Sequence, residues 1–199
     1  MVQIFDNILT QGVRGGQIPA RTQDARNWYR NTAQSYRNVN ETSFLKTGEK
    51  ERFTNTPLVG QMYMFTYNAK WKDELPYWDR FPLVFPFKKI PGGFLGLNMH
   101  YLPLPYRAKL MDSLYSVTNN TLYNETTKLK LSYEMLNKAS QFRYFKPTIK
   151  HYLTDHLMSR FLYIYPAEWD MALFLPLSRF QKASNEQVWK DSRRIIKNS

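Results

Sequence analysis

Gly60 to Leu104 reads GQMYMFTYNAKWKDELPYWDRFPLVFPFKKIPGGFLGLNMHYLPL, and this segment predicts a small β-sheet. Residues 62–67 carry apolar side chains on both faces of an extended chain, which is typical of a strand covered on both sides. A second strand is predicted over Leu83–Phe87 and a third from Phe94 to His100. Pro91-Gly92-Gly93 supplies the turn between them, because glycine accepts the positive φ of tight hairpins. Short strands edged by proline indicate a small bent antiparallel sheet or an SH3-like barrel.

Helical patterns precede this segment. Residues 1–52 predict two helices separated at Gly15-Gly16, and the second is amphipathic from about residue 22 to residue 39. Aromatic side chains share one face of the second helix and three arginines share another. We expect this helix to dock through its rings and to show its arginines outward.

The chain after the sheet predicts helices and two more strands. Residues 103–157 are expected to be helical, and they form the most basic zone of the sequence. Strands are expected over residues 160–165 and 173–177, with a short helix between them. A last helix begins after Ser184-Asn-Glu-Gln187, a capping-box pattern. Its inward face is predicted to hold Val188, Trp189, Ile195 and Ile196.

The predicted fold class is therefore α+β, with the sheet or barrel flanked by N-terminal, central and C-terminal helices. We expect an N-terminal helical extension over residues 1–52 and a single α+β domain over residues 53–199. Within that domain, residues 60–100 form an aromatic β-core and residues 103–157 form a basic helical zone. A chain of 199 residues is long enough to bury a core without staples.

Charge is the strongest clue to partners. The chain has 28 Lys and Arg against 16 Asp and Glu, a net charge of +12, and no cysteine. Such a charge is enough to attract a polyanion. The alternatives are that it keeps the protein soluble or that it complements acidic neighbours in an assembly. No apolar run is long enough for a membrane-spanning helix, so no membrane partner is expected. The candidate phosphate ligands are Arg26, Arg30, Arg37, Lys128, Lys130, Arg143, Lys146 and Lys150.

Aromatic residues make up 16% of the chain, and two functions compete for them. Rings interleaved with basic residues, as in Phe142-Arg143-Tyr144-Phe145-Lys146, can stack on nucleic-acid bases. Aromatic enrichment also marks the core and protein–protein interfaces, where Trp, Tyr and Arg dominate the energetics. The candidate interface residues are Trp28, Tyr36, Tyr77, Trp78 and Trp189.

The search for catalytic patterns finds little. No phosphate-loop, Rossmann glycine, nucleophile-elbow or zinc-protease motif occurs. Asp73, Glu74 and Asp79 could imitate the carboxylates of a metal-dependent nuclease. However, the lysines around them can neutralise them on the surface. We therefore expect a protein that is not an enzyme, with no cofactor, no metal and no small-molecule substrate.

Three stretches carry a resemblance to a known family. They are GQIPARTQDARNWYR near the N-terminus, the central GQMYMFTYNAKWKDELPYWDRFPLVFPF with FLGLNMHYLP, and YPAEWDMALFLPLSRFQKASNEQVWKDS. Together they resemble virion structural proteins of T-even-like contractile-tailed bacteriophages, especially sequences labelled DNA-end protector proteins. The resemblance covers most of the chain in order.

The resemblance implies a non-enzymatic late protein of the virion. Such a protein contacts packaged double-stranded DNA or its ends, shields them from host exonuclease, and joins the head–tail assembly. It is expected in the virion, and in the host cytoplasm during assembly. The competing interpretation is a baseplate, neck or tail-tip subunit that binds only other virion proteins, so that its basic residues match acidic neighbours.

Overall fold

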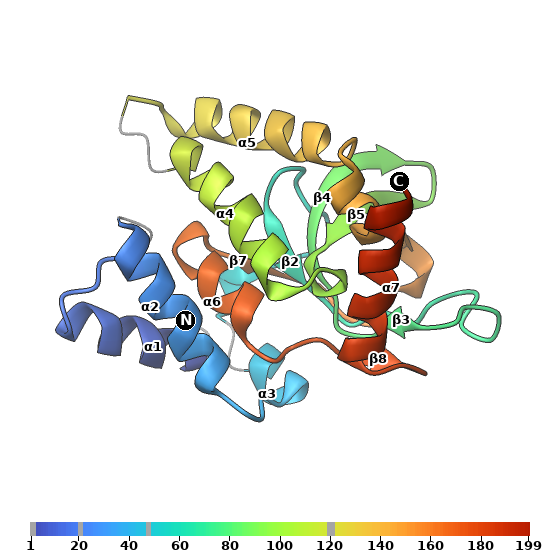
Figure 1. Ribbon diagram of the computed structural model, residues 1–199, viewed down its shortest axis with the longest axis horizontal. Coiled ribbons are helices and arrows are strands. Elements are labelled where there is room, and N and C mark those ends of the chain that lie inside the picture. The colour runs from blue at the N-terminus through green and yellow to red at the C-terminus, as the bar shows by residue number, and fades with distance from the viewer. Residues whose placement is uncertain (1–2, 20–21, 47–48, 119–121) are drawn as a thin grey trace.

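The computed structural model describes residues 3–19, 22–46, 49–118 and 122–199, and its elements are arranged around one central sheet (Figure 1). Six strands pair in the order β1-β7-β2-β4-β5-β6, and every neighbouring pair is antiparallel. The strands are β1 (Phe53–Thr54), β2 (Met62–Met64), β4 (Leu83–Ile90), β5 (Gly93–Asn98), β6 (Ile149–Leu153) and β7 (Phe161–Ile164). The prediction of an α+β fold with an antiparallel sheet is confirmed. The SH3-like barrel is wrong, because β1 and β6 remain the edges of an open sheet.

Helices and a second, two-stranded sheet complete the described chain. The small sheet pairs β3 (Trp78–Asp79) with β8 (Phe180–Gln181). Short 3-10 helices are η1 (Lys50–Arg52), η2 (Met99–Tyr101), η3 (Arg143–Thr148), η4 (Thr154–His156) and η5 (Pro166–Glu168). The α-helices are α1 (Gln3–Arg14), α2 (Gln23–Ser35), α3 (Glu41–Lys46), α4 (Leu104–Thr118), α5 (Glu125–Ala139), α6 (Trp169–Phe174) and α7 (Asn185–Asn198). Within the described ranges, no helix has the length and apolarity that crossing a membrane requires.

The β4–β5 hairpin forms where the sequence predicts it, and its turn depends on glycine. Gly92 has a φ of +73°, in the left-handed region that side chains disfavour. A Cβ on Gly93 would lie 2.0 Å from the carbonyl oxygen of Tyr152, so glycine allows β6 to approach β5. The register shifts between Pro86 and Lys88, which removes the need for a ladder hydrogen bond from proline.

Three local predictions are wrong. The basic zone is not helical to residue 157, since η3, β6 and η4 follow α5. Residues 173–177 do not form a strand, because α6 continues to Phe174. On α7, Ile195 is 41% exposed rather than inward, although Val188 and Ile196 are buried.

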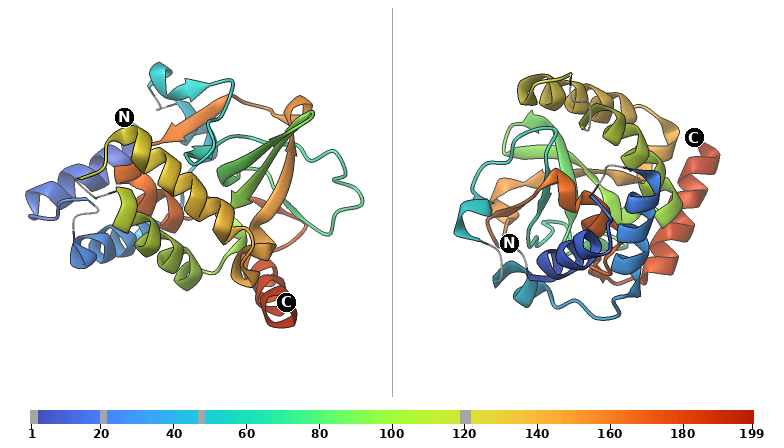
Figure 2. Two further views of the ribbon diagram at one scale, coloured as in Figure 1. Left: turned by 90° about the horizontal axis from the view of Figure 1, so that it is seen from above. Right: turned by 90° about the vertical axis from the view of Figure 1, so that its left-hand side faces the viewer.

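The sheet is covered on both faces, as the double apolar pattern predicts. Tyr63 and Phe65 lie in one cluster with Phe94, Tyr152 and Phe161. Their neighbours on the opposite face join a larger core beneath the helices, which gather mainly on one side of the sheet (Figure 2). Helices α1 and α2 contribute to this same core through residues such as Phe5, Ile8 and Tyr29. The boundary at residue 52 stays a prediction, because a shared core does not show which part folds alone.

Three arginines are buried among these elements. Arg52 makes two hydrogen bonds of 2.7 and 2.8 Å to the carboxylate of Glu168, and its guanidinium lies over the Tyr165 ring. Arg30 bonds Asp170 at 2.6 Å and Asp112 at 2.7 Å, which ties α2 to α6 and α4. Arg107 donates to the backbone carbonyl oxygens of Leu102, Leu173 and His100.

Replacing Arg52 should destabilise the fold far more than replacing an exposed arginine. Arg52→Gln leaves the Glu168 carboxylate buried without its partner, so we expect a loss of about 3–5 kcal/mol in the free energy of unfolding. Arg80→Gln breaks the 2.7 Å pair with Glu41, in which Arg80 is about half exposed, and should cost at most about 1 kcal/mol. Urea unfolding of both variants measures the difference. Equal losses would contradict this account of Arg52.

Candidate nucleic-acid interface

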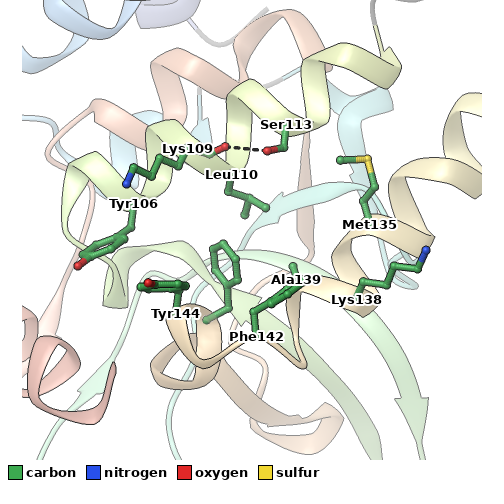
Figure 3. A pocket seen from close by; sticks show the side chains of 10 residues that line it. Tyr106, Lys109, Leu110, Ser113, Met135, Lys138, Ala139, Phe142 and Tyr144 are labelled. Carbon is green, nitrogen blue, oxygen red and sulfur yellow. Dashed lines mark hydrogen bonds between the residues drawn. The ribbon is translucent and has the colours of Figure 1, made fainter. Parts of the chain in front are cut away.

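A groove between α4 and α5 is the most distinctive exposed feature of the basic zone (Figure 3). Its volume is about 440 Å³, and it is floored by apolar side chains such as Leu110, Met135 and Ala139. Tyr106 belongs to the wall on α4, and Phe142 and Tyr144 form the opposite wall. The turn after α5 holds that wall in place, since the backbone N–H of Phe142 donates to Ala139 and that of Phe145 donates to Phe142.

Two tyrosines and an arginine make a layered arrangement at the mouth of the groove. The rings of Tyr106 and Tyr144 stack with centroids 5.9 Å apart and planes 28° from parallel (Figure 3). The guanidinium carbon of Arg143 lies 5.0 Å from the centroid of the Tyr144 ring, and Arg143 donates a 3.2 Å hydrogen bond to the Tyr144 hydroxyl. That hydrogen bond lowers the pKa of Tyr144 and raises the pKa of Arg143. The arrangement offers flat rings beside a fixed positive charge.

Cations surround these rings. Lys109 on α4 and Lys138 on α5 are exposed and line the groove, and they approach it from the two helices (Figure 3). Arg143 and Lys146, both on η3, are exposed as well. Helix α7 packs against η3, and it adds an exposed basic row of its own. That row contains Lys190, Arg193, Arg194 and Lys197.

The structure gathers only some of the eight candidate phosphate ligands. Arg143 and Lys146 are exposed on η3, whose Tyr144 and Phe145 line the groove. Lys128 and Lys130 lie nearer the N-terminus of α5 than the residues that line the groove. Lys150 belongs to β6 and lines a different hollow. The sequence analysis missed Tyr106, Lys109 and Lys138 as site residues. The three-residue spacing of Tyr106 and Lys109 places them on one helical face, and this signal could have identified them.

The arginines of α2 do not form the outward row that the helical pattern predicts. Arg30 is buried, and its guanidinium bonds two carboxylates, so the expectation that it faces outward is wrong. Arg26 lies 3.3 Å from Asp112, whereas Arg37 is exposed beyond the end of the helix. The helical pattern of α2 could not predict this, because Asp112 and Asp170 come from other helices.

The five candidate interface aromatics are half-buried within the chain. Trp28 packs edge-on against Tyr29, and Tyr36 packs against the large core. Tyr77 lies beside Tyr101, and Trp78 packs against the smaller cluster. The indole N–H of Trp189 donates a 2.9 Å hydrogen bond to the His100 carbonyl oxygen. Their use in binding another protein stays a prediction.

The nuclease-like carboxylates do not converge. Asp73 and Glu74 are exposed in the loop before β3, whereas Asp79 is buried. The carboxylate of Asp79 accepts hydrogen bonds from the backbone N–H groups of Phe81 and Arg179 and from the Asn98 amide, and it lies 2.7 Å from His100 Nδ1. Across the described part of the chain, no three His, Asp or Glu side chains are placed to hold a metal ion. Asp79 therefore joins β3 to η2 structurally.

Comparison with known proteins identifies the family. The family described as phage T4 terminal DNA protecting protein matches residues 4–193, and the chain therefore belongs to it. No curated protein and no solved structure matches the chain.

The Asp79–His100 pair should make stability depend on pH. Burial lowers the pKa of His100, and its Nε2 atom is buried without a hydrogen-bond partner in the described chain, so the neutral ring is favoured. Unfolding restores a pKa near 6.5, so the unfolded chain takes up a proton first as the pH falls. The contribution of His100 is complete above about pH 6.5 and declines below it, by up to about 1.4 kcal/mol per pH unit.

Urea unfolding between pH 7.5 and pH 5 measures this decline, and His100→Gln is the control. All other titratable groups are the same in the two proteins, so the difference between the two curves reports on His100. Parallel curves for the two proteins would contradict the neutral, buried state of His100.

Proposed function

Because the chain belongs to the family of the phage T4 terminal DNA protecting protein, we propose that it binds the ends of linear double-stranded DNA and shields them from nucleases. The observation that best supports a DNA-binding surface is the groove between α4 and α5. There Tyr106, Phe142 and Tyr144 are presented beside exposed lysines and Arg143.

Charge and rings supply different parts of the binding. Contacts from Lys109, Lys138, Arg143 and Lys146 to phosphates would give affinity without sequence preference. This affinity falls as the salt concentration rises, because the counterions that binding releases from the DNA gain less entropy in concentrated salt. Ring stacking adds a preference for ends. An internal base pair is already stacked on both sides, whereas a terminal pair has one free face. A protein that stacks on that free face blocks the place where an exonuclease begins.

The protection requires occupancy of the DNA end and no bond cleavage, so we propose that the protein acts without catalysis. We also propose that it is a late component of the virion that joins the head–tail assembly, where the ends of packaged DNA lie. The protein-only alternative, a baseplate, neck or tail-tip subunit, uses the same basic surface against acidic neighbours.

Binding to a blunt linear duplex and to a closed circle of the same sequence, across a salt series, tests the proposal. We expect tighter binding to the linear form, affinity that falls steeply with salt, and slower exonuclease digestion of linear DNA in the presence of the protein. Equal binding to both forms would overturn end recognition. No binding at about 50 mM salt, where phosphate contacts are strong, would leave the protein-only alternative.

Removing an exposed ring should reduce the preference for ends. Tyr144→Ala removes the stacked ring, and since stacking contributes about 1–3 kcal/mol per base, the ratio of linear to circular affinity should fall about 5- to 150-fold. Tyr144→Phe keeps the ring and loses only the hydroxyl, so it should retain the ratio. A ratio that is unchanged in both variants would remove Tyr144 from the site.

Removing cations should instead lower affinity for both DNA forms. The double variant Arg143→Gln, Lys146→Gln should reduce the slope of log affinity against log salt by about 0.9 for each lost phosphate contact. The matched control is Lys46→Gln, Lys50→Gln, an equal change of charge on α3 and η1, away from the groove. Equal slopes for the two double variants would show that the groove is not the phosphate-binding surface.

A further inference from the structure

A second hollow, of about 500 Å³, lies between the loop that precedes β3 and strand β6. Its walls are largely aromatic, and its most exposed ring, Trp71, is 56% accessible at the mouth. Tyr77, Trp78 and Tyr101 lie along the wall. Lys150, one of the candidate phosphate ligands of the sequence analysis, also lines this hollow.

Lys150 is a cation held among rings. Its ammonium nitrogen lies 3.8 Å from the centroid of the Tyr101 ring. Within the described chain, no carboxylate lies at ion-pair distance from it. Burial lowers the pKa of Lys150 to about 8. The nearest wall carboxylate, that of Asp79, is already satisfied by His100, Asn98 and two backbone N–H groups. An anion in the hollow would supply the partner that Lys150 lacks.

A second polar atom of the hollow is also unpaired. The indole nitrogen of Trp78 is buried, and no acceptor for its N–H lies within hydrogen-bond distance in the described chain. A buried donor without an acceptor is unfavourable, and native structures seldom contain one without a reason. Because this N–H has almost no accessible surface, the ammonium group of Lys150 is the one that a ligand with several acceptor oxygens would satisfy.

The mouth of the hollow is fixed in place. The ammonium of Lys182 donates to the backbone carbonyl oxygens of Lys72, Asp73 and Leu75, at 2.6, 3.1 and 3.3 Å. These contacts anchor the loop that carries Trp71 to the residue after β8. Lys70 lies 5.0 Å from the centroid of the Trp71 ring, so a second cation stands at the entrance.

We propose that this hollow binds the terminal nucleotide of a DNA strand through its phosphomonoester, with the phosphate beside Lys150 and the base among the aromatic side chains. The proposal rests on the function proposed above and names the chemical group that marks an end. A phosphomonoester carries about −1.5 to −2 charges at neutral pH, whereas an internal phosphodiester carries one. Such a group occurs only where a strand begins or stops.

The chain connects this hollow directly to the groove between α4 and α5. Helix η3 supplies Tyr144 and Phe145 to the groove and exposes Arg143 and Lys146, and β6 begins at the next residue and supplies Lys150 to the hollow. One short segment therefore contributes to both places. A duplex end has two strand termini, so one can stack on the rings of the groove while the terminal nucleotide of the other enters the hollow beside Lys150.

The test compares four DNAs of one sequence: linear duplexes with a 5′-phosphate, with a 3′-phosphate or with hydroxyl groups only, and a closed circle. We expect one of the phosphorylated duplexes to bind about tenfold more tightly than the hydroxyl duplex, as a charge-assisted hydrogen bond allows. The two phosphorylated arms show which strand terminus the hollow accepts. Lys150→Met should abolish the preference, and Lys150→Arg should keep it.

Equal binding of all three linear duplexes, each tighter than the circle, would overturn this inference and leave the proposed end protection intact. Equal binding of linear and circular DNA would overturn the proposed function itself. A phosphate preference that survives in Lys150→Met would place the phosphate elsewhere. Trp71→Ala, at an exposed position, provides a second variant should Lys150→Met unfold, and it should weaken binding of the phosphorylated duplex alone.

Discussion

Three buried arginines need hydrogen-bond partners, and this need constrains how the helices pack around the sheet. Arg30 and Arg52 are held by carboxylates, whereas Arg107 is held by three backbone carbonyl oxygens. Each guanidinium needs partners from elements far apart in the sequence, because an unpaired buried charge is strongly destabilising. Arg30 thereby ties α2 to α4 and α6, and Arg52 ties η1 to η5. These arginines also count in the net charge of +12 without being available to a polyanion.

The sequence pattern correctly predicted those elements whose structure depends on residues close together in the chain. The hairpin turn at Pro91-Gly92-Gly93 and the doubly covered β2 strand follow from glycine geometry and from the spacing of apolar residues. Strand β6 was not predictable in this way, since its Lys150 and His151 interrupt the apolar pattern and its pairing with β5 stabilises it. The open sheet differs from the predicted barrel for a similar reason. A barrel closes only if its two edge strands, here β1 and β6, pair with each other, and the sequence of each strand does not show this.

The candidate site was half predictable. The run from Phe142 to Lys146 shows its interleaved rings and cations in the sequence. In the structure its three rings line one groove, and Arg143 and Lys146 are exposed on η3. The opposite wall comes from α4, so the stacking of Tyr106 on Tyr144 arises only from tertiary packing. The helical periodicity of α2 predicted that Arg30 faces outward. The prediction was wrong because this periodicity contains no information about Asp112 and Asp170, which come from other helices.

The strand order has a consequence for how the chain folds during its synthesis. Strand β7 lies between β1 and β2, and Met62 pairs with Ile164, so one half of the sheet stays incomplete until more than a hundred further residues have been made. Until then, β2 exposes a free edge and its aromatic face to other chains. Pairing at such sequence separation is slow, and exposed edges of this kind aggregate. Rapid synthesis at high concentration is therefore the condition under which this protein is most prone to misfold.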